Sequence, residues 1–362
     1  MSAPTHDDLE ALSEAAQRAA NGGRHAEAAL HFRALTDAAR LRGMLDTAAQ
    51  AATLAGSALR RDDRPAEALV AQEEAIALLR RGDPGATSRI QLAQAERAAS
   101  LLDAGQAAAS AEAYADLLAQ GPIASLAAIA LDGLIGARLL LGEVEAARLA
   151  FAQLQAQAEG PGRLALAFRE AALLRLSGEL DAAEAAHEGL RAGLDGPRFV
   201  APRAASLHDS GEIALLRQRF KAAVRSFEAA EEGFRAAGRP IGQHRAQLAL
   251  LRVRLAQGKR AEVGRLGPML AYAASRGLPL FEAELRLGEG NLLQAAGAPS
   301  LAAFDRGLHL AAQAGARFLA GRLHLSRWRA SGEAIDRQRA RDQLDGDLPW
   351  RAEVESERRR LW

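Results

Sequence analysis

The chain has 362 residues, with 46 Lys and Arg against 45 Asp and Glu, and it contains no Cys. The lack of Cys excludes disulfides, thiolate catalysis, iron–sulfur clusters and Cys-ligated zinc. The near-zero net charge argues against a strong overall field for nucleic acid or a membrane. Val, Ile and Thr, which favour strands, together number only 20, whereas the strong helix formers Ala, Leu and Arg are abundant. We therefore expect an all-α protein.

The chain begins with eight residues that carry neither the basic nor the apolar region of a secretory signal. No run of about 18 apolar residues follows that would suit a membrane helix. We therefore expect a cytoplasmic protein that does not bind membranes.

A short turn followed by an Ala-rich amphipathic segment then recurs eight times, at intervals of 36 to 42 residues. Such a regular period predicts a helical repeat protein in which each turn joins two helices. The turns are marked by one anchor residue each: Gly23, Asp63, Gly105, Gly142, Gly178, Gln218, Gly258 and Gly297.

Three positions relative to each anchor have a constant character. Five residues after the anchor, six of the eight repeats have Ala, which suits a site where two helices approach closely. The residue seven before the anchor is small or apolar in all eight. Nine residues after the anchor there is often an aromatic ring, and we expect these rings to lie in the core. The residues at this position are Phe32, Gln72, Tyr114, Phe151, His187, Phe227 and Gly267, with Phe304 seven residues after the anchor in the last repeat.

Gly at the turn, Ala five residues on and Tyr or Phe nine residues on resemble the tetratricopeptide repeat (TPR). The period is longer than the usual 34 residues and the closing Pro of that family is mostly absent, as in the degenerate TPR-like repeats of bacterial regulators. The resemblance implies a right-handed α-solenoid, a superhelix of eight to nine helix-turn-helix repeats. We expect eight helical hairpins over residues 1–315, and a ninth, partial repeat with a capping helix over residues 316–362.

The last segment contains all three tryptophans, Trp328, Trp350 and Trp362. We expect helices over residues 316–331, 334–344 and 350–361. One interpretation is a capping helix held by Trp350, since terminal repeats need a polar outer face. The other is a tail that docks a partner or a second copy of the chain as a homodimer.

The sequence has no motif typical of an enzyme. There is no Gly-rich phosphate-binding loop, no G-x-S-x-G nucleophile turn and no H-E-x-x-H metal site. The tail has too little excess positive charge for a DNA-reading helix. We therefore expect no enzymatic activity, no cofactor, no metal and no direct contact with nucleic acid.

TPR-like solenoids present their first helices on a concave face, and this resemblance assigns the candidate ligand positions. Arg245 and Arg252, seven residues apart and so on one helix face, are expected with Arg175 to bind an acidic segment, or else to form a solvated basic face. Asn291 would clamp a peptide backbone through its amide, or else be an ordinary exposed polar residue. The full set of candidate ligand or peptide positions is Arg175, His208, Glu212, Arg245, Arg252, Glu284 and Asn291.

The resemblance implies a non-enzymatic adaptor or scaffold that binds a protein or peptide in its groove. The alternative is a regulatory sensor, a solenoid that binds a peptide or small ligand and acts with a separate DNA-binding or signalling partner.

Overall fold

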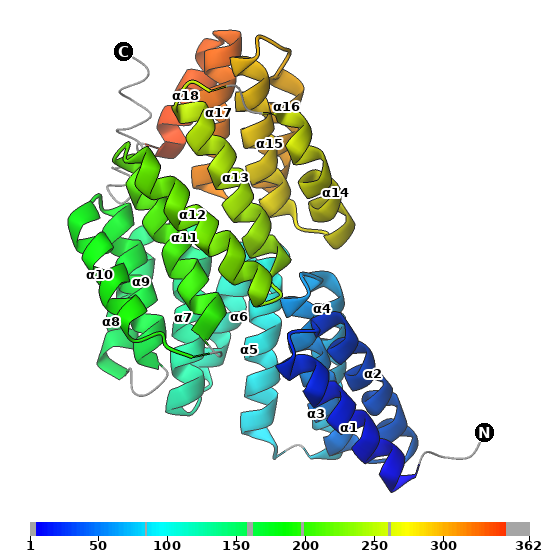
Figure 1. Ribbon diagram of the computed structural model, residues 1–362. Helices are drawn as coiled ribbons and strands as arrows, with labels where there is room; N and C mark the ends of the chain where they lie inside the picture. Colours follow the sequence, from blue (N-terminus) through cyan, green and yellow to red (C-terminus); the bar gives the residue numbers. More distant parts are fainter. Residues whose placement is uncertain (1–4, 84, 158–161, 197–198, 260–261, 345–362) are drawn as a thin grey trace. The chain divides into compact units, whose positions relative to one another are not determined.

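The computed structural model of the protein describes residues 5–83, 85–157, 162–196, 199–259 and 262–344. Within these ranges every regular element is helical and none is a strand (Figure 1). Helices that follow one another in the chain pack against each other through most of this length. The prediction of an all-α fold is confirmed, and its arrangement of consecutive packed helices is typical of a helical repeat protein.

The chain divides into two compact units, residues 1–134 and residues 135–362. In the first unit, a capping box at Thr5 starts the first helix: its hydroxyl accepts from the backbone N–H of Asp8, whose carboxylate accepts from the N–H of Thr5. The helices of this unit are α1 (His6–Asn21), α2 (His25–Leu41), α3 (Leu45–Arg61), α4 (Pro65–Gly82), α5 (Thr87–Asp103), α6 (Ala107–Ala119) and most of α7 (Ala124–Leu141).

The second unit begins within α7 and continues the same alternation of helices. The predicted boundary at residue 315 lies inside this unit, where α16 packs against α17. Its helices are α8 (Val144–Gln157), α9 (Gly162–Leu176), α10 (Leu180–Ala192), α11 (Val200–Leu216), α12 (Phe220–Ala236), α13 (Pro240–Ala256), the short 3-10 helix η2 (Val263–Arg265), α14 (Leu266–Arg276), α15 (Pro279–Ala295), α16 (Leu301–Gln313), α17 (Arg317–Ser331) and α18 (Ala334–Leu344).

All eight anchor residues lie between two helices and have left-handed backbone conformation, with φ between 57° and 81°. In each turn, the residue after the anchor donates its backbone N–H to the carbonyl oxygen four residues before the anchor, at 2.8–3.0 Å. This is the hydrogen bond of a Schellman motif, which ends a helix through a left-handed residue. Asp63 and Gln218 are the two anchors that adopt this conformation with a side chain, which costs about 1 kcal/mol relative to Gly.

The three repeated positions form the core. The small residue five after the anchor is fully buried in the first six repeats, and the residue seven before the anchor is buried in all eight. Small side chains are needed at such positions because side chains of the facing helix come very close. At Gly211, for example, an added Cβ atom would lie 2.6 Å from Cε1 of Phe227. The ring positions are also mostly buried, as expected; Phe32, Tyr114, Phe227 and Phe304 are each at most 3% exposed.

The last two repeats depart from this pattern. In the seventh, Val263 lies in the 3-10 helix η2 and is only partly buried against the core, and Gly267 is exposed. In the eighth, Ala302 is exposed, and Ser300, four residues before Phe304, is buried instead.

Helix α7 is the one helix, among the described residues, that is apolar and long enough to cross a membrane by length and composition. Half of that window is buried inside the protein, and a core helix satisfies the same test. Asp132 and Arg138 interrupt its apolar residues.

The C-terminal hairpin joins α17 to α18, in close agreement with the helices expected over residues 316–331 and 334–344. Asp336 of α18, 1% exposed, accepts a hydrogen bond from Nδ1 of His324 at 2.8 Å and contacts the guanidinium of Arg327. Trp328 is half-buried, and the guanidinium of Arg337 lies over its ring at 5.3 Å. Buried charge pairing thus fixes α18 on α17. Trp350, Trp362 and the expected helix over 350–361 lie outside the described residues.

Candidate functional site

Charged side chains of four alternate helices, α9, α11, α13 and α15, form the candidate site. These are the first helices of successive hairpins, and pairs of side chains link them one repeat apart. We call the set the polar ladder; it consists of Arg175 on α9, His208, Asp209 and Glu212 on α11, Arg245 and Arg252 on α13, and Glu284 on α15.

The best enclosed link of the polar ladder joins α11 to α13. Nη1 of Arg252 donates to Oε1 of Glu212 at 2.8 Å, and the Glu212 side chain is only 14% exposed. Burial alone would raise the pKa of Glu212, but the charges of Arg252, His208 and Arg175 outweigh it and hold this pKa below its ordinary value. Glu212 is therefore a carboxylate held ionised by arginines of the two neighbouring first helices, α9 and α13.

Asp209, one turn before Glu212 on α11, is also kept ionised by its neighbours. Burial raises the pKa of Asp209, but His208, whose Nδ1 lies 3.8 Å from Oδ1 of Asp209, and the charge of Arg175 lower this pKa further than burial raises it. His208 itself packs edge-on against Phe227, with ring centroids 5.3 Å apart. The buried ring of Phe227 therefore holds the His208 ring in place beside Asp209.

The link between α13 and α15 is more exposed. Nε and Nη2 of Arg245 donate to the two carboxylate oxygens of Glu284 at 3.2 and 3.3 Å, a bidentate pair. The two side chains are 41% and 36% exposed. The Arg245 guanidinium also lies over the ring of Phe281, at 5.8 Å from its centroid.

The structure therefore brings together six of the seven predicted ligand positions. Arg252 pairs with Glu212, Arg245 pairs with Glu284, and Arg175 and His208 act on Glu212. Asn291 lies two turns along α15 from Glu284, half-buried, and makes no side-chain hydrogen bond with the described residues. Because Arg245 and Arg252 already pair with carboxylates, an acidic ligand that binds them competes with Glu284 or Glu212.

Two buried residues next to the polar ladder were not predicted as part of it. His187, fully buried, lies with Nδ1 3.2 Å from Oγ of Ser206 and with Nε2 3.9 Å from Oδ2 of Asp209. This order of Ser, His and Asp resembles a hydrolase triad, but Ser206 is also fully enclosed and cannot reach a substrate. The arrangement serves packing, and burial lowers the pKa of His187, so the ring is neutral at pH 7.

An equivalent link occurs in the first unit. Arg60 of α3 reaches Glu96 at 3.5 Å and Asp103 at 3.4 Å on α5, and Oγ of Ser57 donates to Glu96 at 3.0 Å. These partners again stand about one repeat apart. Links between first helices one repeat apart therefore occur in both units, whereas two partly buried carboxylates, Asp209 and Glu212, lie close together on α11.

The polar ladder has no arrangement suited to a metal ion. No group of three His, Asp or Glu residues in the described ranges is close enough to hold one. Its carboxylates are instead occupied by guanidinium and imidazole groups.

No protein-family model matches the chain, and no curated protein sequence matches it. The likeness to TPR proteins therefore depends on the anchor spacing and the three repeated positions, which the structure places in helix-ending turns and in the core.

Proposed function

We propose that the protein is a non-enzymatic adaptor or scaffold, built as a right-handed TPR-like superhelix, that binds a protein or peptide along the polar ladder. The observation that carries this proposal is the one-repeat spacing of half-buried charged pairs on successive first helices, Arg252 with Glu212 and Arg245 with Glu284. Such a face offers donors and acceptors at regular intervals along the direction in which an extended chain would lie.

The charges of the polar ladder define the kind of partner. Its three arginines face three carboxylates, so the set is neutral apart from His208. A neutral face gives little long-range attraction. Binding then depends on exchange of partners: an acidic side chain of the ligand takes the place of Glu284 beside Arg245, because that pair is the most exposed.

The experiment that tests this proposal compares four versions of the full chain in a salt-dependent capture from cell lysate, quantified by mass spectrometry. Arg245→Ala should lose the specific partners, and Glu284→Gln should capture more of them, because it removes the competing carboxylate. Arg254→Gln, an exposed substitution on the same helix, is the matched control. Equal capture by all four versions would rule out the polar ladder as the binding face.

A regulatory sensor is the second candidate function. The links from α11 to α13 and from α13 to α15 join successive repeats and so contribute to the spacing between them. A ligand that exchanges these links would change that spacing, which a partner protein could detect. A ligand-dependent rise in the melting temperature, without capture of any protein, would favour the sensor over the adaptor.

The C-terminal tail remains a candidate for docking a partner or a second copy. Trp328 is already packed under Arg337 within the hairpin, so this role falls to residues after Leu344. Light scattering of the full chain and of a chain ending at Leu344, which keeps α18, tests homodimer formation; an unchanged mass would exclude the tail. We propose the cytoplasm as the location, with neither a membrane nor nucleic acid as a direct partner.

A further inference from the structure

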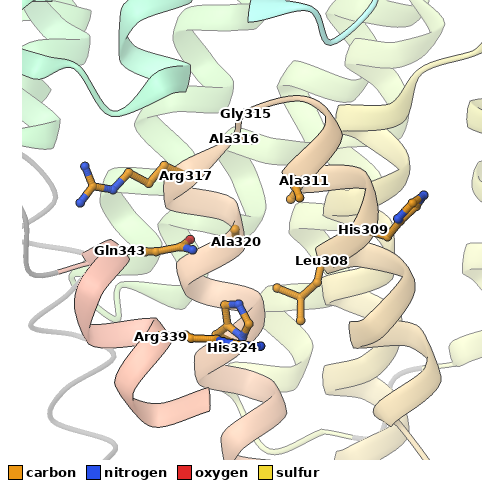
Figure 2. A pocket seen from close by; sticks show the side chains of 11 residues that line it. Leu308, His309, Ala311, Gly315, Ala316, Arg317, Ala320, His324, Arg339 and Gln343 are labelled. Atoms are coloured by element: carbon orange, nitrogen blue, oxygen red, sulfur yellow. The ribbon is translucent and has the colours of Figure 1, made fainter. Parts of the chain in front are cut away.

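A cleft of about 450 Å³ lies at the C-terminal hairpin, between α16, α17 and α18 (Figure 2). Its floor is formed by Ala316, Ala320 and His324, which follow one another at intervals of four residues and so share one face of α17. The volume falls within the range of roughly 300–1,000 Å³ that small-molecule sites occupy. The cleft involves none of the polar-ladder residues.

One side of the cleft is apolar. Helix α16 contributes Leu308, Ala311 and Ala312, and Figure 2 shows Leu308 directed into the space beside Ala320. None of the residues lining the cleft is acidic. This wall therefore fits an aliphatic chain and does not repel an anion.

The opposite side, on α18, carries polar groups four residues apart. Figure 2 shows Arg339 directed toward His324, and Gln343 directed toward Ala320. Among the described residues Arg339 has no ion pair, and Oε1 of Gln343 is buried without a hydrogen-bond partner. A cation and the amide side chain that bears an unsatisfied acceptor thus line the same space. An unsatisfied buried acceptor favours a ligand that brings a donor.

His324 supplies a second acceptor. Its Nδ1 lies 2.8 Å from Oδ1 of Asp336, a group that only accepts, so the proton of the neutral ring is on Nδ1. Nε2 then carries a lone pair. Arg317 and His309 are directed away from the space in Figure 2, and Arg317 donates to the carbonyl oxygen of Asp342 at 2.9 Å.

We propose that this cleft binds a small aliphatic hydroxy acid. The carboxylate pairs with Arg339, the hydroxyl donates to Oε1 of Gln343 or Nε2 of His324, and the alkyl chain lies along Leu308 and the alanines of α16 and α17. The acceptors distinguish this class from a plain fatty acid, and Arg339 distinguishes it from a neutral alcohol.

Isothermal titration of the full chain with β-hydroxyoctanoate tests the proposal, with octanoate and the corresponding diol as matched ligands. We expect saturable binding at one site, about tenfold weaker for octanoate and not measurable for the diol. Arg339→Gln should weaken binding at least tenfold. Ala312→Glu, which places a carboxylate on an exposed position of the apolar wall, should abolish it.

Arg341→Gln is the control for Arg339→Gln, since Arg341 is exposed on the same helix but does not line the cleft. Thermal melts by circular dichroism verify that each variant is folded. The proposal is overturned if the unmodified chain shows no saturable binding, or if the Arg339 and Arg341 variants bind equally. Tighter binding of a short peptide ending in leucine would also contradict it, by assigning the cleft to a peptide carboxyl terminus.

Discussion

The ring of Phe227 packs directly on the backbone of Gly211, on the facing helix of the same hairpin. A Cβ atom on Gly211 would lie 2.6 Å from Cε1 and 2.7 Å from Cδ1 of this fully buried ring. The same ring supports His208, which faces Asp209 and Glu212. The close packing at Gly211 therefore also affects His208, one residue of the polar ladder.

Gly211→Ala should destabilise the second unit by about 1–3 kcal/mol, because the buried ring must move to accommodate the new methyl group. Phe227→Leu in the same chain should recover part of this loss, which a double-mutant cycle from urea unfolding would measure.

Gly189→Ala is the matched control for that substitution. Gly189 lies in α10 with nothing within 4 Å of the position of a Cβ atom. There the same change should stabilise the protein by about 0.5–1 kcal/mol, through helix propensity alone. If Gly211→Ala were stabilised as well, the contact with Phe227 would not be what excludes a side chain at Gly211.

Gln218→Gly should stabilise the turn between α11 and α12 by about 1 kcal/mol. Gln218 is exposed and has a φ of 57°, so glycine relieves the strain without removing a buried contact. Gly258→Gln, which introduces the same residue at the next anchor, where φ is 69°, should destabilise by a similar amount. Melting temperatures of the two variants that shift in the same direction would contradict this account.

The repeat could be predicted from the sequence because its turns and its close helix contacts each accept few residue types. A left-handed anchor favours Gly, and a helix contact such as Gly211 with Phe227 excludes a side chain on one partner. The irregular seventh repeat escaped prediction, since Val263 and Gly267 keep the spacing of the pattern while the chain forms a 3-10 turn.

The candidate site could be predicted only in part. Its positions were assigned from the resemblance to TPR proteins, but its pairings could not be assigned in this way. Arg252 and Glu212 are 40 residues apart, and their contact depends on how successive repeats stack. Asp209 was missed because nothing in its local sequence distinguishes it from the many exposed carboxylates.

The two arginines of α13 should contribute differently to stability. Arg252→Gln should cost about 1–3 kcal/mol, because Glu212, 14% exposed, loses its hydrogen-bonded cation. Arg245→Gln should cost at most about 1 kcal/mol, because both members of that pair are well exposed to solvent. Urea unfolding of the two variants measures the difference, and equal costs would show that burial does not separate these pairs.

His187 should make the second unit less stable in mild acid. Burial lowers the pKa of His187 below its ordinary value of 6.5, opposed by Asp209 and assisted by Arg191 and Arg175. The unfolded chain therefore binds a proton more readily than the folded one. Stability is then unaffected well above pH 6.5, falls as the pH drops below it, and levels off below the folded pKa. The lowered pKa of Asp209 acts in a separate window, below about its ordinary 3.8.

Urea unfolding between pH 8 and pH 5 would measure this dependence, and His187→Gln is the variant that should reduce it. Glutamine is compatible with this place in the repeat, because Gln72 occupies the equivalent position in the second repeat and is fully buried. The exposed His309→Gln serves as the control and should leave the slope unchanged. If the free energy of unfolding of His187→Gln still fell with pH as steeply as that of the unmodified chain, the acid sensitivity would belong to groups other than the His187 imidazole.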